Sequence, residues 1–322
     1  MELARAKCAP RPSKRPGGIL RFFRLVRTNA SLLTMAAPAV VWVIVFSYLP
    51  MFGIVIAFKN YRAADGILGS AWVGLKNFRF LFLTDAIWRA TRNTVLMNSL
   101  FIITGTVGSI VVALMLNEVR SRLLSRAYQA AMFFPYFVSI VIVSYFVFAL
   151  LSTDHGLINR LLVRLGGQKV IWYARPMAWP VILILVNLWK GLGVGSIIYL
   201  AAILGINPEF YEAAQIDGAS KLQQIRYITL PHLVSVMIIM ILLAIGGIFR
   251  ADFGLFYIVT RNQGVLYPTT DVIDTYVYRA LQEIAQPSMA AAAGFYQTIV
   301  GFILVLLSNW AVKKVDPDRS LF

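Results

Sequence analysis

Long apolar runs recur along this 322-residue chain, and they constrain its fold more than any other feature. An α-helix needs about 20 apolar residues to cross the roughly 30 Å hydrocarbon core of a bilayer. Charged residues make up only 14% of the chain, whereas about 25% is usual in soluble domains. We therefore predict an all-α integral membrane protein with six transmembrane helices, at about residues 32–58, 93–117, 128–151, 178–201, 229–249 and 288–312.

The first 30 residues differ from the rest because basic residues dominate them, with Glu2 as the one acid. From Ile19, arginines at every third position alternate with apolar residues, which predicts a short helix on the inner membrane surface. We predict a basic cytoplasmic tail over residues 1–30 and a six-span domain over residues 31–322. The positive-inside rule keeps the N-terminus in the cytoplasm, and six spans return the C-terminus to the same side. A signal peptide is the weaker alternative, because the run 32–58 is longer than a signal h-region.

The net charge of +16 does not indicate nucleic-acid binding, because the basic residues cluster at the flanks of the apolar runs and no nucleic-acid-binding motif accompanies them. Cys8 is the one cysteine, and His155 and His232 lie too far apart in sequence to suggest a metal site. The phosphate-binding pattern G-x-x-x-x-G-K-[ST] is absent, and no nucleophile, base and orienting residue are placed recognisably. The sequence thus favours neither an enzyme nor a chain that binds a cofactor.

A polar, helix-prone stretch, residues 207–231, separates the fourth and fifth apolar runs. It is predicted to contain two short helices. Asn207 should cap the first helix, with the proline that follows at the first helical position. Gly218 should end that helix, and Ser220 with Gln223 forms a capping box for the second. A chain that only turns around at a membrane needs fewer residues, so this segment suggests a docking surface.

One face of the first predicted helix suits insertion into a groove of another protein. Phe210, Ala213 and Ala214 lie three or four residues apart, the small alanines permit close approach, and Glu212 adds a fixed charge. The alternative is a surface helix that links two spans and binds nothing. The predicted docking residues are Phe210, Tyr211, Glu212, Ala213, Ala214, Asp217 and Gly218.

The E-A-A at 212–214, the glycine six residues after the glutamate, and the I-x-L-P that ends at Pro231 resemble the EAA loop of permease subunits of ATP-binding-cassette (ABC) importers. Three further stretches resemble sugar permeases: W-V-G-L-K-N-F-R-F-L-F at 72–82, R-A-Y-Q-A-A-M-F-F-P-Y-F-V-S at 126–139, and Y-P-T-T-D-V-I-D-T-Y-V-Y-R at 267–279. From about residue 30 to its S-L-F end, the chain resembles the larger permease subunit of carbohydrate importers, in the maltose and lipo-oligosaccharide families. The first permease subunit of alginate importers is the most specific resemblance.

This resemblance implies a type I ABC importer permease fold in a bacterial inner membrane, with residues 207–231 as the cytoplasmic coupling helix segment. It also implies the partners: a second homologous permease, two copies of an ATPase that bind ATP and Mg, and an extracytoplasmic solute-binding protein. Transport would proceed by alternating access. The expected cargo is an oligo- or polysaccharide.

The fourth apolar run contains N-x-W-x-G, which resembles a sugar-contacting pattern of the maltose permease at the same distance before the EAA glutamate. Asn187 and Gly191 match the contacting positions, and Trp189 could stack on a sugar. Helix packing through glycines is the alternative. Lys190 should face a cavity or a partner, because a cation is costly within a span. A lysine in the cavity would suit an acidic, alginate-like sugar, whereas an interhelical ion pair or snorkelling would not involve sugar. From Lys190 and the basic outer loops we predict an acidic oligo- or polysaccharide.

Three other hypotheses remain open at this stage. An importer of neutral oligosaccharides would have the same fold. A secondary transporter needs coupling acids or inverted repeats within its spans, and no acid lies deep in any of the six. A membrane scaffold would transport nothing. The sugar contacts of the maltose permease do not carry over, because Ala244 and Ile248 stand where that permease has polar residues.

Overall fold

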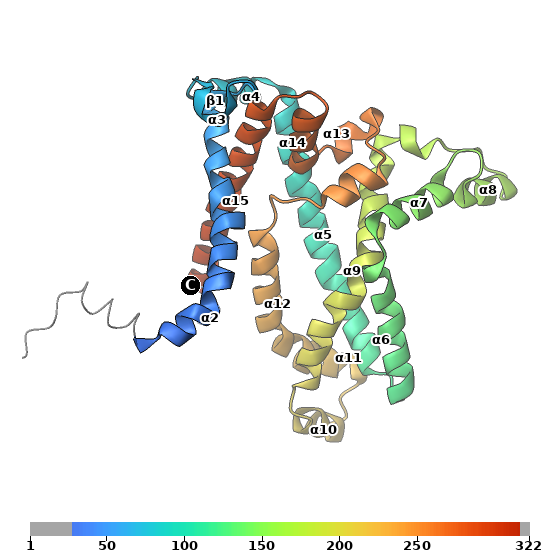
Figure 1. Cartoon of the computed structure of the whole chain (residues 1–322). Helices are drawn as coiled ribbons and strands as arrows, with labels where there is room; N and C mark the ends of the chain where they lie inside the picture. The colour runs from blue at the N-terminus through green and yellow to red at the C-terminus, as the bar shows by residue number, and fades with distance from the viewer. Residues whose placement is uncertain (1–27, 316–322) are drawn as a thin grey trace, which may run out of the picture. The chain divides into compact units, whose positions relative to one another are not determined.

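The computed structural model describes residues 28–315 (Figure 1). The chain divides into two compact units at Gly53–Ile54. The predicted surface helix from Ile19 and the C-terminal S-L-F lie outside the described residues. The division of the chain at residue 30 stays a prediction.

The described part of the first unit is one apolar helical run. It consists of α2 (Ala30–Val43), the helical turn η1 (Ile44–Tyr48) and the beginning of η2 (Leu49–Phe58). Every residue from 28 to 52 is exposed. The run Ala30–Phe58 is long and apolar enough to cross a membrane, as the sequence predicts for its first span. A helix that is apolar all round requires a lipid or protein environment.

The second unit is helical apart from one short antiparallel ladder, in which β1 (Lys59–Asn60) pairs with β2 (Ala71–Trp72). Its longer helices are α5 (Asp85–Asn117), α6 (Arg122–Phe137), α7 (Ile140–Leu151), α9 (Trp179–Leu204), α12 (Leu230–Gly246) and α15 (Pro287–Val315). The shorter ones are α3 (Gly66–Gly69), α4 (Lys76–Leu83), α8 (Leu157–Arg164), α10 (Glu209–Ile216), α11 (Lys221–Gln224), α13 (Tyr267–Thr270) and α14 (Ile273–Gln282). Single turns complete the unit: η3 (Trp172–Ala174), η4 (Pro176–Ala178), η5 (Ile225–Thr229), η6 (Gly254–Val259) and η7 (Gly264–Leu266).

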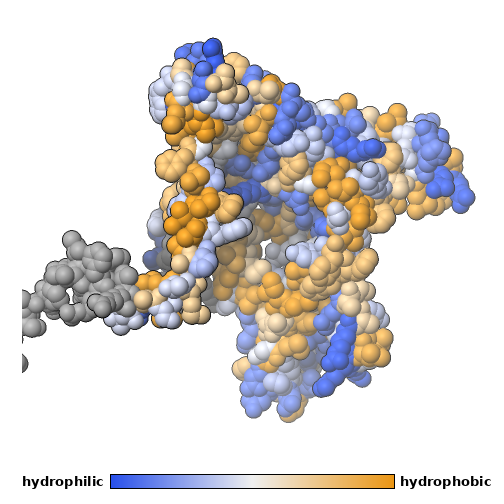
Figure 2. Space-filling model, in the orientation of Figure 1, coloured by the Kyte–Doolittle hydropathy of each residue, from blue (hydrophilic) through white to orange (hydrophobic). Residues whose placement is uncertain are grey.

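The helices that are long and apolar enough to cross a membrane agree with the predicted spans. Within the described residues there are five of them, or up to six if the bent pair α6–α7 is one span. In the second unit, α10 and α11 lie at one end and α13 and α14 at the other (Figure 1). Hydrophilic surface gathers at the α10–α11 end and around α8, with largely apolar surface between them (Figure 2). This distribution is typical of a helical membrane protein.

The predicted third span, 128–151, is two helices and not one. α6 and α7 meet at a break where the chain bends by 96°. Val138 and Ser139 have extended backbones there, with ψ of 126° and 140°, and Pro135 lies in the last turn of α6. Because a proline disrupts the hydrogen bonds of the helix around it, this turn is the weakest point of the apolar run.

The core of the second unit lies where α5 packs against α9. A Cβ atom added at Gly195 would lie 2.3 Å from the Ser109 Oγ of α5, so the missing side chain is what lets the two helices approach. Toward the α10 end, a buried cluster joins α5, α9 and α12 and includes Leu116, Ile203 and Leu233. This cluster supports the polar segment that follows α9.

Candidate functional site

The polar segment after α9 has the local structure that its sequence predicts. The Asn207 Oδ1 accepts the backbone N–H of Glu209 at 3.1 Å, although α10 begins at Glu209, one residue later than expected. Gly218 ends the helix with φ of +77°, a conformation that glycine adopts without strain. Ser220 and Gln223 form the capping box that opens α11. Each feature depends on residues within a few positions of one another.

The predicted docking residues divide into an exposed and an inward-facing set. Phe210, with 52% of its surface exposed, and Glu212, Ala213, Asp217 and Gly218 are exposed, while Ala214 is half-buried. Tyr211 faces inward instead, because its hydroxyl bonds to Thr229 Oγ1 at 2.9 Å. α10 therefore presents a surface that contains an aromatic ring, a carboxylate and a small residue, and Tyr211 fastens its inner side.

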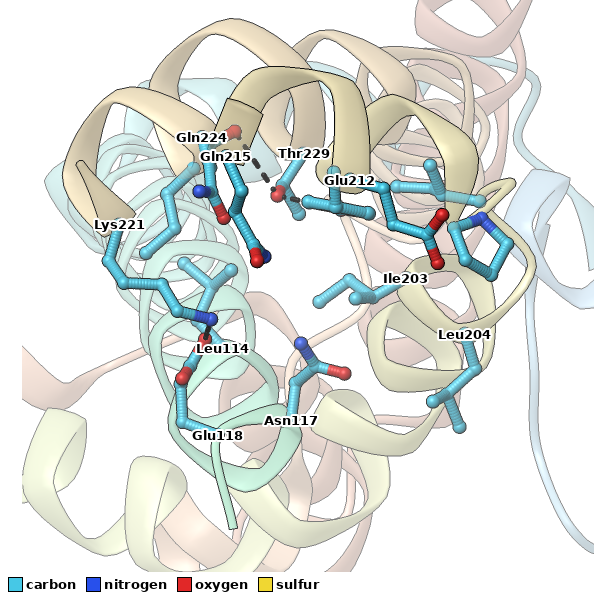
Figure 3. A pocket seen from close by; sticks show the side chains of 14 residues that line it. Leu114, Asn117, Glu118, Ile203, Leu204, Glu212, Gln215, Lys221, Gln224 and Thr229 are labelled. Atoms are coloured by element: carbon cyan, nitrogen blue, oxygen red, sulfur yellow. Dashed lines mark hydrogen bonds and ion pairs between the residues drawn. The ribbon is translucent and has the colours of Figure 1, made fainter. Parts of the chain in front are cut away.

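A pocket of about 360 Å³ lies between α10, α11 and the ends of α5 and α9 (Figure 3). Glu212 and Gln215 of α10 line it, and Asn117 lies across from them on α5. Lys221 Nζ pairs with Glu118 Oε1 at 3.3 Å, but both side chains are exposed, so the pair contributes little stability. Within residues 28–315, no three His, Cys, Asp or Glu side chains gather closely enough to hold a metal ion.

The second short helix runs on into the membrane without a break. α11, η5 and α12 form one helical run over Lys221–Gly246, which is among the candidate spans. Pro231 lies in the first turn of α12, as predicted for the start of the fifth span. Buried Gln224 donates its Nε2 hydrogen to the Ala219 carbonyl at 3.1 Å, which ties the start of this run to the turn before it. The sequence did not indicate that the polar segment and the span share one helix.

The residues of the predicted substrate path lie on α9 and differ in surroundings. Trp189 is 45% exposed, Gly191 is also exposed, and Asn187 is half-buried. Among the described residues, the Asn187 amide has no hydrogen-bond partner. A Cβ added at Gly191 would meet nothing within 4 Å, so close helix packing within this chain does not explain that glycine. Packing does explain Gly193, where an added Cβ would lie 2.2 Å from the Met132 carbonyl of α6.

Lys190 reaches the break between α6 and α7. Its Nζ donates to the Val138 carbonyl at 2.7 Å and lies 3.3 Å from that of Tyr136 and 3.5 Å from that of Pro135. The carbonyls lie at and just beyond the end of α6, where that of Pro135 accepts the Val138 N–H at 3.2 Å, and a cation is favourable at the C-terminal end of a helix. Among the described residues, Lys190 has no carboxylate partner, and its ammonium group contacts backbone carbonyls at the α6–α7 break.

Ala244 and Ile248, where the sequence departs from the maltose permease, line a groove of about 370 Å³ between α5, α9 and α12. The groove is largely apolar. Its polar side chains include Asn98, which donates to the Ile248 carbonyl at 2.7 Å, and Ser109. Ala244 and Ile248 thus offer no polar side chain to the groove, where the maltose permease has polar residues that contact sugar.

An ionic cluster that the sequence did not reveal fastens the segment before α14 to α5. Buried Asp271 pairs with Arg279 and, at 3.2 Å, with Arg89 of α5. The Arg279 guanidinium also lies 4.2 Å from the ring centre of Tyr267. Burial raises the pKa of the Tyr267 phenol, and the positive charge of Arg279 opposes that rise. The sequence signal was a run of charged and aromatic residues at 267–279, but the partner Arg89 lies 182 positions from Asp271.

Comparison with known sequences gives consistent findings. Residues 105–320 match the family described as "Binding-protein-dependent transport system inner membrane component". The polygalacturonan/rhamnogalacturonan transport system permease protein YteP of Bacillus subtilis (strain 168) is 39% identical over 289 residues, which is 89% of each chain. Protein LplB of the same bacterium is 32% identical over 315 residues, covering 95% of this chain and 98% of its own length.

Solved structures also match over nearly the whole chain. One is a chain of a bacterial ABC transporter involved in the import of the acidic polysaccharide alginate, with a TM-score of 0.83 and 34% identity over 92% of this chain and 99% of that one. Another is a chain of the bacterial alginate ABC transporter in complex with an alginate pentasaccharide-bound periplasmic protein, with a TM-score of 0.82 and 34% identity. It covers 92% of this chain and 98% of that chain.

Proposed function

Because the chain belongs to the family of binding-protein-dependent transport system inner membrane components, we propose that it is one half of a heterodimeric permease that imports acidic oligo- or polysaccharides. The chain is a multi-pass membrane protein, the permease of a binding-protein-dependent ABC sugar importer, with the type I importer fold. The proposed part concerns the partners, the orientation, the working residues and the charge of the cargo.

The exposed surface of α10 is the observation that carries the coupling role. Phe210, Glu212, Ala213, Asp217 and Gly218 are open to a partner, while Tyr211 and the α11–α12 run hold the helix against the bundle. We place this surface on the cytoplasmic side, where each of two ATPase subunits binds ATP and Mg. Both termini of the chain lie on that side. Closure of the ATPase dimer moves α10, and the permease pair changes from inward to outward access.

The proposed sugar path follows the exposed side of α9. Asn187 offers an amide without a partner in the described chain, Trp189 offers an aromatic face, and Gly191 leaves room beside them. Lys190 belongs to the same surface by position, and its ammonium group shapes the path by holding the break between α6 and α7. A solute-binding protein outside the membrane delivers the sugar to this path.

The acidic character of the cargo is supported by two kinds of relatives. The names of the YteP relative and of the alginate transporters specify uronate-containing polysaccharides. A relative named for lactose transport, from Rhizobium radiobacter, is 27% identical, so neutral sugar is the outcome against which the proposal is tested.

Proteoliposomes that contain the permease pair, the ATPase and the binding protein provide the experiment. ATP hydrolysis is measured with binding protein loaded with a uronate oligosaccharide or with a neutral oligosaccharide of equal length. We expect stimulation by the uronate oligomer. Stimulation by the neutral sugar alone would refute the acidic cargo and leave the permease role intact, whereas full ATP-independent uptake would refute the coupling role.

A further inference from the structure

A second pocket, distant in sequence from the coupling segment, lies beside α7 and α8. Its volume is about 800 Å³, within the roughly 300–1,000 Å³ range of small-molecule sites. We call it the α7–α8 pocket. It is formed by the end of α7, the start of α8, the segment before η4 and the turn after η6, and the residues that matter below are Phe148, Asp154, Arg160, Tyr173 and Arg261.

The lining of the α7–α8 pocket carries uncompensated positive charge. Arg160 and Arg261 have no carboxylate partner among residues 28–315. The one acid that lines the pocket, Asp154, is exposed and lies 3.5 Å from Lys169, so together with the two arginines these side chains carry a net positive charge. Arg160 and Arg261 therefore line the same space without a carboxylate partner among the described residues. Arginine is the side chain best suited to bind a carboxylate, because its planar fork donates two parallel hydrogen bonds.

Aromatic rings form the wall beside these charges. The Arg261 guanidinium lies 4.2 Å from the ring centre of Phe148, and the Phe148 and Tyr173 rings meet edge to face at 5.9 Å. Burial raises the pKa of Tyr173 to about 12, against the opposing charge of Arg261, so its hydroxyl stays protonated. Rings beside arginines offer an apolar face for a sugar and a charge for its carboxylate.

The backbone that carries Arg261 is held in an unusual conformation. Arg261 and Asn262 have φ of +56° and +48°, values that non-glycine residues rarely adopt. Side chains fix this turn, because Asn262 Nδ2 donates to Glu283 at 2.9 Å and the Tyr267 hydroxyl donates to Asn262 Oδ1 at 2.9 Å. Strain of this kind persists where the surrounding structure over-determines it, which is common at binding sites.

From these features we propose that the α7–α8 pocket is a subsite for one uronate unit of the transported saccharide, with Arg261 and Arg160 pairing with its carboxylate and Phe148 and Tyr173 forming the apolar wall beside its ring. The inference rests on the proposed import of acidic saccharide. It adds a place where the carboxylate is recognised, separate from the residues of α9.

The test uses the complete importer in proteoliposomes and the substitution Arg261→Asn, because asparagine tolerates the left-handed backbone but carries no charge. Uptake of a uronate oligosaccharide, ATP hydrolysis without sugar, and thermal stability are measured for each variant. Arg261→Lys keeps the charge, and Arg164→Asn removes a matched charge from α8 outside the pocket.

We expect Arg261→Asn to reduce uptake by about tenfold, the effect of one charge-assisted hydrogen bond, with sugar-free ATP hydrolysis and thermal stability unchanged. Arg261→Lys keeps the charge but not the planar fork, so it should recover only part of the uptake, whereas Arg164→Asn should stay within about twofold of wild type. Wild-type uptake by Arg261→Asn would overturn the subsite, as would a loss that comes with lower stability. A higher concentration of binding protein needed for half-maximal ATP hydrolysis would assign Arg261 to docking and also overturn it. If the unaltered importer takes up no uronate, the proposed cargo itself is wrong.

Discussion

Replacement of Lys190 by methionine separates its contacts with the α6–α7 break from a role in sugar binding. Methionine fills a similar volume but donates no hydrogen bond. The change leaves the Val138 carbonyl, at 2.7 Å from Nζ, without its donor. It also removes the longer contacts of Nζ with the Tyr136 and Pro135 carbonyls. The perturbation therefore acts at one identified point, the bend between two helices.

The size of the effect follows from the three distances. The contact at 2.7 Å is a full hydrogen bond from a charged donor, which contributes about 1.5–3 kcal/mol. The contacts at 3.3 and 3.5 Å are long and contribute about 1 kcal/mol together. We expect Lys190→Met to lose about 3 kcal/mol of stability.

Thermal unfolding of the purified permease pair in detergent measures this loss, with Lys190→Arg as the charge-retaining control. We expect the Tm of Lys190→Met to fall by roughly 5 °C or more, and that of Lys190→Arg to stay closer to wild type. Uptake should fall by the same factor for every sugar tested. A methionine variant that keeps the wild-type Tm and loses only the uptake of acidic sugar would refute this reasoning, and would assign the ammonium group a role in sugar binding.

Three further predictions concern the coupling helix, the packing of α9 and the ionic cluster. Glu212→Ala should insert normally and lower sugar-stimulated ATP hydrolysis, because it removes a charge from the exposed face of α10. Unchanged stimulation and uptake would exclude Glu212 from coupling to the ATPase. Gly193→Ala should cost about 1–3 kcal/mol in thermal stability, since its Cβ would overlap a backbone carbonyl, while Gly191→Ala at an open position should leave the Tm unchanged. Asp271→Asn should cost about 3–5 kcal/mol by leaving two arginines unpaired, and a wild-type Tm would show that the cluster contributes no net stability.

Sequence reasoning succeeded where the structure depends on neighbouring residues. Asn207, Gly218, and Ser220 with Gln223 each act over a few positions, so the sequence alone predicts the helix ends they define. Long apolar helices are predictable for a similar reason, because the bilayer requires each span to satisfy its own backbone hydrogen bonds.

Features that depend on distant residues were missed. Pro135 was visible in the third run, but a proline in a membrane helix is often tolerated, and the 96° bend is stabilised by Lys190, 52 residues beyond Val138. The charge of Lys190 was noticed from the sequence, whereas its backbone partners were not. The bond between Arg89 and Asp271 joins positions 182 apart, and pairing of this kind needs the tertiary fold.

The unbroken helix from Lys221 to Gly246 has a mechanical consequence. Its 26 residues make a stiff rod about 39 Å long, at 1.5 Å per residue, which is comparable to the thickness of a whole bilayer. Beyond the π-helical turn η5 and Pro231, which lie near its coupling end, a rod of this length conveys a tilt to its far end with little loss. The compliant point lies beyond it, at Gly246 and Gly247, where α12 stops. The angular range of that glycine pair would then set how far the far side of the protein opens for a given displacement at the coupling helix.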